Sequence, residues 1–147
     1  MEIAVLGLGC FWGPEIKFSK VSGVIKTEVG YCGGNTKETT YEEVCTGKTN
    51  HAEVVKLDFD PKIISYEKIL EYFFEIHDST TLNSQGPDFG TQYRSEIFYL
   101  NDQQKIIAKK IIEEENKRLS EKVVTKISLV KNYCAAEEYH QKYLEKR

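Results

Sequence analysis

The chain has 147 residues, of which 40% are hydrophobic and 29% are charged, and its formal net charge is -3. This length suits one sizeable core, so we expect residues 1–147 to form a single domain. The acidic balance argues against a nucleic-acid partner, which would favour a basic patch. No apolar run reaches the ~18 residues of a membrane span, and no basic region of a signal peptide opens the chain. We therefore expect a cytoplasmic protein that binds neither nucleic acids nor membranes.

Segments with strand and helix patterns alternate along the chain. Strands are expected at residues 3–8, 24–29, 53–59, 93–100 and 123–130. Helices are expected at residues 14–20 and 135–144, from the cap Thr40 through Cys45, and after the caps Ser65 and Asn101. The caps are side chains that accept a hydrogen bond from the first helical turn. On its own, this alternation favours an open sheet of parallel strands covered by helices.

Two segments are expected to be loops. GYCGG at residues 30–34 carries three glycines. Residues 77–92 form a long connection, and connections of this length in compact domains are often functional. The helix after Asn101 is expected to bury one apolar face, formed by Ile106, Ile107, Ile111 and Ile112.

Residues 53–59 alternate between apolar and polar side chains, as a half-buried strand does. Glu53 has the same parity as the apolar residues Val55 and Leu57. Its carboxyl group should therefore point inward, where it must be neutral or hydrogen-bonded.

GLGCFWG at residues 7–13 follows the first strand and allows two interpretations. A dinucleotide-binding loop needs a third glycine at position 12, but Trp12 stands there and would fill the space of the pyrophosphate. The second interpretation is a reactive cysteine. Cys10 lies just before the helix that contains Pro14, where free backbone N–H groups should lower the pKa of the thiol. The residues alone also allow a buried, unreactive Cys10 beside core aromatics.

The remaining cysteines and the histidines show no metal-binding pattern. The cysteines are Cys10, Cys32, Cys45 and Cys134, and the histidines are His51, His77 and His140. No C-x-x-C pair occurs and the histidines lack zinc-ligand spacing, so we expect no metal. In a reducing cytosol the cysteines are expected to be thiols.

GCFWG at residues 9–13 resembles the active-site signature of the peptide methionine sulfoxide reductase A family. Similar blocks follow in the family's order: GYCGG at 30–34, YEEVCTG at 41–47, HAEVV at 51–55, GTQYRS at 90–95 and AEEYHQ at 136–141. The resemblance implies a thiol-dependent oxidoreductase that reduces methionine S-sulfoxide, free or in proteins, and so repairs proteins under oxidative stress. It also implies an α+β fold, a two-layer α/β sandwich with a mixed sheet and a ferredoxin-like core, and we prefer this to the parallel sheet.

The resemblance assigns the chemistry to four residues. Cys10 would attack the sulfoxide sulfur and become a sulfenic acid. Glu53 would hydrogen-bond or protonate the sulfoxide oxygen, and burial should raise its pKa toward neutrality. Tyr31 and Tyr93 would offer hydroxyl groups to the same oxygen.

The resemblance also implies residues that bind the substrate. Phe11 and Trp12 would hold the S-methyl group, and Asp88 would help to orient the substrate or its loop. His140 fits a peripheral histidine of the last helix. The other cysteines and histidines that we expect to be structural are Cys45, Cys134, His51 and His77.

The chain departs from the family in how Cys10 could be regenerated. Many relatives continue past the last helix with a tail that carries resolving cysteines, and this chain lacks one. We therefore expect no bound cofactor and an external thiol reductant, such as glutathione with glutaredoxin, or thioredoxin. Cys32 is the alternative resolving thiol, provided that its Cα comes within about 7 Å of that of Cys10. Asn50 and Ala135 replace an expected glycine and an expected proline.

Two other classes of protein remain as alternatives. A non-catalytic domain could bind oxidised methionine in the same aromatic pocket, although Cys10 and Glu53 are both intact. Another cysteine-based thiol enzyme, a peroxidase or a hydrolase, could use the same loop. A hydrolase would need a base near Cys10, and His51 is its candidate.

Overall fold

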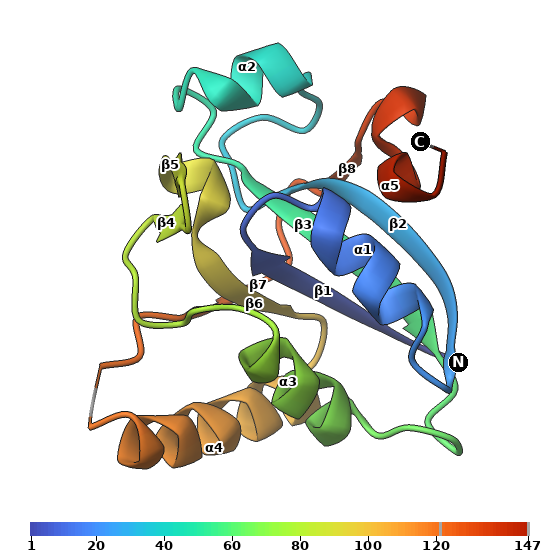
Figure 1. Ribbon diagram of the computed structural model, residues 1–147, viewed down its shortest axis with the longest axis vertical. Coiled ribbons are helices and arrows are strands. Elements are labelled where there is room, and N and C mark those ends of the chain that lie inside the picture. Colours follow the sequence, from blue (N-terminus) through green and yellow to red (C-terminus); the bar gives the residue numbers. More distant parts are fainter. Residues whose placement is uncertain (121, 147) are drawn as a thin grey trace.

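The computed structural model describes residues 1–120 and 122–146. Among them, six strands form one mixed sheet and two short strands form a hairpin (Figure 1). The sheet contains β1 (Glu2–Leu8), β2 (Val24–Cys32), β3 (Ala52–Phe59), β6 (Ser95–Tyr99), β7 (Lys126–Leu129) and β8 (Cys134–Ala135), and the hairpin contains β4 (Ser84–Gln85) and β5 (Asp88–Phe89). The helices are α1 (Trp12–Ser19), α2 (Tyr41–Cys45), α3 (Tyr66–Glu75), α4 (Asp102–Arg118) and α5 (Tyr143–Lys146), with the 3-10 helices η1 (Thr91–Tyr93) and η2 (Glu138–His140).

The strand order in the sheet is β7-β6-β1-β3-β2-β8, and β6 and β7 are its parallel neighbours. The other neighbouring pairs are antiparallel. α1 connects β1 to β2 and α3 connects β3 to β6, so these elements form a ferredoxin-like core. This confirms the α+β fold with a mixed sheet. The parallel sheet suggested by alternation is wrong, because β3 lies between β1 and β2 and runs against both.

The two faces of the sheet are covered differently. The face that carries Leu57 packs against α1, α3 and α4 in the main apolar core, which includes Phe18, Ile69 and Ile111; we call it the helical face. The opposite face, the back face, carries a smaller cluster packed against residues 130 and 133. Its buried members are Val5, Cys32, Ala52, Val54 and Phe98. Figure 1 shows α1 lying across the sheet, with α3 and α4 below it.

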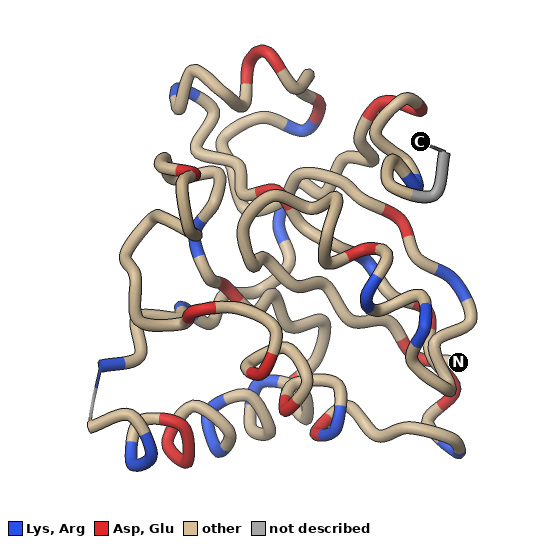
Figure 2. Tube along the Cα trace, viewed as in Figure 1, with Lys and Arg blue, Asp and Glu red and all other residues tan. Residues whose placement is uncertain are grey.

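Charged residues of both signs are interspersed along α4 and along β2 (Figure 2). Lys110 of α4 bonds Glu67 of α3 at 3.2 Å. Positive and negative charges therefore alternate on these elements rather than forming a basic patch. In the described part of the chain, no helix is long and apolar enough to cross a membrane.

The predicted helix caps are confirmed. The side chains of Thr40, Ser65 and Asn101 each accept a hydrogen bond from the backbone N–H three residues later, at the starts of α2, α3 and α4. The long connection at residues 77–92 contains the β4–β5 hairpin and part of η1, and the strand predicted at residues 123–130 shortens to β7.

The loop predicted at residues 30–34 is wrong over its first three residues, because β2 continues to Cys32. Gly30 pairs with β8, and a Cβ at Gly30 would lie 2.7 Å from the carbonyl oxygen of Cys134. This glycine therefore permits the close approach of β8 rather than a turn. The chain leaves the strand only at Gly33, where φ is +84°.

The helix predicted at residues 135–144 is also wrong. The segment runs along the edge of β2 as β8, η2 and the four-residue α5. The side-chain amide of Gln141 donates to the Val29 carbonyl, and its oxygen accepts from the Val29 N–H. These bonds hold the segment beside β2, and a φ of 51° at Lys142 interrupts any right-handed helix.

Two further expectations fail at single residues. Tyr93 was expected to begin a strand, but it lies in η1. On α4, Ile106 is exposed rather than part of the buried face. Gln104 is buried instead, because its amide donates to the Ile3 carbonyl and so satisfies its polar atoms in the core.

Candidate active site

The turn between β1 and α1 carries the GCFWG block. β1 ends at Leu8 and α1 begins at Trp12, so Cys10 lies in the turn and is half-buried. Gly9 has a φ of +97°, and a Cβ there would lie 2.8 Å from the side chain of Gln85. The turn therefore requires glycine at this position.

Glu53 of β3 lies against the start of α1. Its residue is 1% exposed, and its Oε1 accepts a hydrogen bond from the Phe11 N–H at 3.2 Å. Its Oε2 has no hydrogen-bond partner among the described residues. Burial raises the pKa of Glu53 to about 8; the Phe11 N–H opposes this rise and the charge of Asp88 adds to it. The inward orientation predicted from the strand pattern is confirmed, and at neutral pH the carboxyl group is mainly protonated.

The thiol of Cys10 does not have the lowered pKa that its position predicts. Burial raises its pKa to about 11, the Trp12 backbone N–H acts in the opposite direction, and the charges of Glu53 and Asp88 add to the rise. Desolvation and two acidic neighbours thus outweigh the start of α1. In the resting site both Cys10 and Glu53 hold their protons at neutral pH.

Asp88 lies on β5 and is half-buried. Its charge raises the pKa of Cys10, of Glu53 and of Tyr93. The charge of Asp88 on the hairpin therefore acts on the thiol, on the carboxyl group of Glu53 and on the Tyr93 hydroxyl. Figure 1 shows the hairpin, α2 and the C-terminal segment at one end of the molecule.

The expected substrate-binding aromatics differ in burial. Phe11 is 1% exposed, and its ring lies 5.8 Å from that of Tyr31 and 5.3 Å from that of His140, between centroids. Trp12 is partly buried and stacks on Tyr143 at 3.9 Å. Phe11 is therefore a core residue that borders the site, whereas Trp12 keeps an accessible part.

His140 is 2% exposed rather than peripheral. Its Nδ1 accepts a hydrogen bond from the Trp12 indole N–H at 3.0 Å, and burial lowers its pKa. Because Nδ1 accepts, the neutral ring carries its proton on Nε2, which has no partner among the described residues. His140 thus fixes the orientation of Trp12.

The Tyr31 side chain lies on the helical face, and its residue pairs with Glu53 across β2 and β3. Tyr31 is fully buried, and its hydroxyl donates to Glu137 at 2.8 Å. Burial first and Glu137 second raise the pKa of Tyr31. The hydroxyl is therefore close to the site but already has an acceptor.

Tyr93 is half-buried, and burial followed by the charge of Glu53 raises its pKa to about 12. Tyr41 on α2 acts on the pKa of Tyr93 in the opposite direction. Sequence reasoning missed Tyr41 and Glu137 as neighbours of the site. Both lie in blocks that resemble the family, and their presence there was the available signal.

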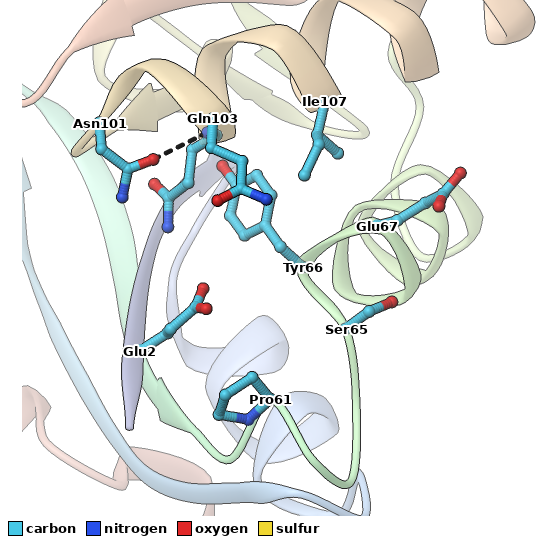
Figure 3. Close-up of a pocket in the computed structure, with 9 residues that line it drawn as sticks. Glu2, Pro61, Ser65, Tyr66, Glu67, Asn101, Gln103 and Ile107 are labelled. Atoms are coloured by element: carbon cyan, nitrogen blue, oxygen red, sulfur yellow. Dashed lines mark hydrogen bonds between the residues drawn. The ribbon is translucent and has the colours of Figure 1, made fainter.

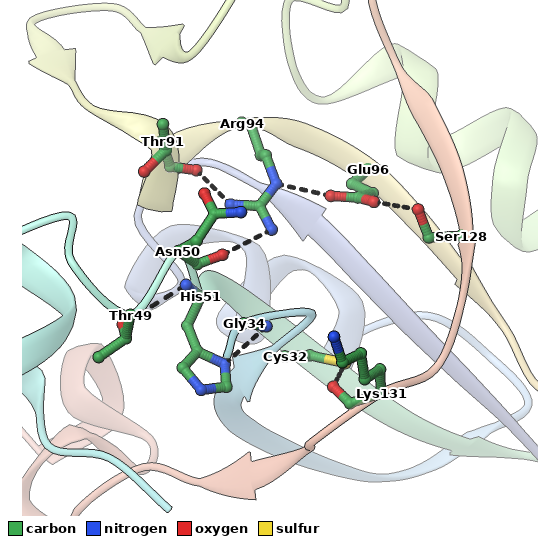
Figure 4. Close-up of polar contacts among 10 residues, drawn as sticks. All are labelled: Cys32, Gly34, Thr49, Asn50, His51, Thr91, Arg94, Glu96, Ser128 and Lys131. Atoms are coloured by element: carbon green, nitrogen blue, oxygen red, sulfur yellow. Dashed lines mark hydrogen bonds and ion pairs between the residues drawn. The ribbon is translucent and has the colours of Figure 1, made fainter. Parts of the chain in front are cut away.

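The back face holds a separate set of polar contacts (Figure 4). Arg94 bonds Glu96 at 2.6 Å and donates to the carbonyl oxygens of Asn50 and Thr91. Cys32 is buried in the back-face cluster, and its thiol donates to the Lys131 carbonyl at 3.4 Å. Cys32 therefore points away from the face that carries Glu53.

His51 has a structural environment, as expected. Its Nδ1 accepts from the Gly34 N–H at 3.1 Å (Figure 4). Its Nε2 bonds the Thr36 carbonyl at 2.8 Å. Cys45 was expected to be structural but is exposed on α2. All four cysteines are free thiols. In the described part of the chain, no three His, Cys, Asp or Glu side chains could hold a metal ion together.

A hollow of about 220 Å³ lies between the starts of α3 and α4 and the first residue of β1 (Figure 3). It is lined by Glu2, Tyr66 and Gln103, among others, and by none of the expected site residues. β1 runs from Glu2 to Leu8, so its full length separates this hollow from the Cys10 turn.

The fold and this constellation define an α+β protein that presents a half-buried thiol beside a buried, protonated carboxyl group, as a thiol-dependent oxidoreductase would. A family model described as peptide methionine sulfoxide reductase matches residues 2–147. The chain belongs to this family.

Known relatives agree over the whole length. Peptide methionine sulfoxide reductase MsrA of Pelagibacter ubique is 80% identical over 147 residues, which are 100% of both chains. The crystal structure of Mxr1 from Saccharomyces cerevisiae in reduced form matches with a TM-score of 0.94 and 41% identity, over 99% of this chain and 85% of that one. Mxr1 in complex with Trx2 matches with a TM-score of 0.68 and 29% identity, over 97% and 84%.

Proposed function

We propose that this protein reduces methionine S-sulfoxide, free or in proteins, to methionine, with Cys10 as the nucleophile. Membership of the family supports the reaction. One observation supports the assignment of residues: the N–H of Phe11, the residue after Cys10, binds Oε1 of Glu53, and the other carboxyl oxygen has no partner among the described residues.

In the proposed step, the sulfur of Cys10 attacks the sulfoxide sulfur while Glu53 protonates the sulfoxide oxygen. The oxygen moves to Cys10, which becomes a sulfenic acid, and methionine leaves with two more electrons than the sulfoxide had. The proton that the thiol loses restores the acid form of Glu53. Cys10 needs this exchange because burial holds its pKa at about 11.

The remaining residues orient the substrate. Tyr93 would donate a hydrogen bond to the oxygen as negative charge develops. Tyr31 would do the same once its hydroxyl turns away from Glu137. The accessible part of Trp12 and the edge of Phe11 would hold the S-methyl group, and Asp88 would help to orient the substrate or its loop. When the methyl group and the oxygen of the sulfoxide are both held in place, only one epimer turns its sulfur toward Cys10. By family resemblance, this is the S epimer. Comparable turnover of both purified epimers would contradict this pocket.

The proposed recycling uses an external thiol, without a bound cofactor. The thiol attacks the sulfenic acid, releases water and forms a mixed disulfide, and a second thiol then frees Cys10. Cys32 points to the back face, so it does not compete. The yeast relative in complex with Trx2 supports thioredoxin as the class of reductant; glutathione with glutaredoxin is the second candidate.

The test is a single turnover without reductant. One equivalent of methionine S-sulfoxide should remove one free thiol and leave a dimedone adduct on Cys10, located by peptide mass mapping. Cys10→Ser should give neither methionine nor adduct, because an alcohol is a far weaker nucleophile. Substantial activity in Cys10→Ser would refute the nucleophile. A disulfide between Cys10 and Cys32 would refute the external thiol.

The alternatives are less well supported. A hydrolase would need His51 as base, but both of its ring nitrogens are engaged by Gly34 and Thr36. A binding domain would not need a protonated acid beside the thiol. We also infer a single domain over residues 1–147, since one sheet links β1 to β8, and a cytoplasmic location, for which cell fractionation is the test.

A further inference from the structure

We propose that Glu137 is a positioning residue for the reaction, which acts by holding the hydroxyl of Tyr31. This inference rests on the proposed function, because it gives Glu137 a role only if Tyr31 contacts the sulfoxide oxygen. Neither the sequence motifs nor the family comparison assigns a role to this residue.

Both oxygens of the Glu137 carboxylate are engaged by parts of the site. Oε1 accepts from the Tyr31 hydroxyl at 2.8 Å, and Oε2 accepts from the Tyr41 N–H at 2.9 Å. Tyr41 is the first residue of α2. One carboxylate therefore links the Tyr31 hydroxyl to the start of this helix.

Glu137 is ionised at neutral pH. Burial acts to raise its pKa, but the bonds from the Tyr41 N–H and the Tyr31 hydroxyl, with His140 nearby, outweigh burial and lower it. An ionised carboxylate only accepts hydrogen bonds. It is the opposite of Glu53, which holds its proton and can donate.

Tyr31 has one hydroxyl proton, and in this structure the hydroxyl donates its hydrogen bond to Glu137. A fully buried hydroxyl without an acceptor would be costly, so Glu137 keeps Tyr31 in one orientation while no substrate is bound. When a sulfoxide oxygen arrives, the proton can swing from one acceptor to the other without movement of the ring. Glu137 thus prepares Tyr31 for the step without touching the substrate.

The chain offers a matched control. Glu28 also accepts a hydrogen bond from a tyrosine, Tyr133, and this pair likewise joins β2 to the segment before the C-terminus. Among the described residues, the side-chain hydrogen bond of Glu28 goes to Tyr133 and involves none of Cys10, Glu53 and Tyr31. Glu28→Ala therefore removes an equivalent pair outside the site.

The experiment is a double-mutant cycle on the single-turnover rate of sulfoxide reduction, with thermal melting to show that each variant is folded. Glu137→Ala should lower the maximal rate about tenfold, the effect expected for one lost charged hydrogen bond, and change KM less. Glu137→Asp, which keeps the charge, should recover part of the rate. Glu28→Ala should keep the wild-type rate.

The decisive readout is coupling with Tyr31. In the Tyr31→Phe background, Glu137→Ala should cause no further loss, because the hydroxyl that it holds is gone. An equal loss in both backgrounds would overturn the inference and leave Glu137 as a structural residue. A wild-type rate in Glu137→Ala, together with a loss of rate in Tyr31→Phe, would overturn the inference on Glu137 and leave the proposed role of Tyr31 standing. A wild-type rate in Tyr31→Phe would overturn the proposed role of Tyr31 and, with it, that of Glu137.

Discussion

The two faces of the sheet each bury a glutamate, and the two carboxyl groups have opposite surroundings. On the back face, Glu96 bonds Arg94 at 2.6 Å and accepts from the hydroxyl of Ser128. On the helical face, Glu53 receives one backbone N–H, and its Oε2 has no partner within residues 1–120 and 122–146. The residues are almost equally buried, at 4% and 1% exposed. Burial alone therefore does not decide the role of a carboxyl group; the presence or absence of a cation beside it does.

The largest effect is expected when the ion pair between Arg94 and Glu96 is broken. Arg94→Leu should lower the free energy of unfolding by about 3–5 kcal/mol, because it leaves a buried carboxylate without its cation. Urea unfolding at neutral pH measures this loss. The double variant Arg94→Leu with Glu96→Leu should recover most of it. A single variant as stable as the wild type would show that Glu96 does not depend on Arg94.

The next largest effect is expected on the rate of sulfoxide reduction when the carboxyl group of Glu53 is replaced. Glu53→Gln should slow sulfoxide reduction in a single turnover by about 10²-fold, because the amide cannot protonate the oxygen. It should not destabilise the fold. Burial raises the pKa of Glu53 from 4.5 to about 8, so the wild type loses stability as pH rises through this range, and the glutamine variant does not. Equal rates in the two proteins would make Glu53 a merely buried strand residue.

The pH dependence of the rate sharpens the same contrast. The reacting form has Glu53 protonated and Cys10 ionised, with pKa values of about 8 and about 11. Its population rises about tenfold per pH unit below pH 8 and is constant between the two values. We expect the single-turnover kcat/KM to follow this curve. In Glu53→Gln the rise should continue past pH 8, and a break retained near pH 8 would assign it to another group.

The smallest expected effect is on the back-face thiol. Cys32→Ala should leave the steady-state turnover with an external thiol unchanged, because the Cys32 side chain points away from the Cys10 turn. Turnover with dithiothreitol measures this, with Cys10→Ser as the inactive control. A fall in turnover, restored by a large excess of reductant, would identify Cys32 as a resolving thiol after all.

The local patterns of the sequence predicted much of the fold. Capping residues placed the starts of α2, α3 and α4, and strand parity placed the carboxyl group of Glu53 inside. These features depend on neighbours within a few residues, which a sequence displays directly. The resemblance supplied the sheet type, since strand direction depends on contacts across the whole chain.

The failures share one physical cause, which is contact between segments far apart in the sequence. Gly30 was predicted to lie in a loop because no neighbour in the sequence shows that β8 packs against it. The last helix was predicted from the local pattern of residues 135–144, which does not show that Gln141 bonds Val29. The pKa of Cys10 was predicted from one helix end, and the burial and acidic neighbours that reverse it come from β3 and β5. Glu137 could not be paired with Tyr31 across 106 residues.

The docking of the C-terminal segment on β2 has a consequence for synthesis. Residues 137 and 140 hold Tyr31 and Trp12, which leave the ribosome more than a hundred residues earlier. The N-terminal two-thirds of a nascent chain can pair β1 with β3 and form the Cys10 turn, but its tyrosine and tryptophan have no anchors yet. Because contacts of such long sequence separation form late, the site assembles only when synthesis has passed residue 140. An incomplete chain stalled before that point should display its thiol without a working pocket around it.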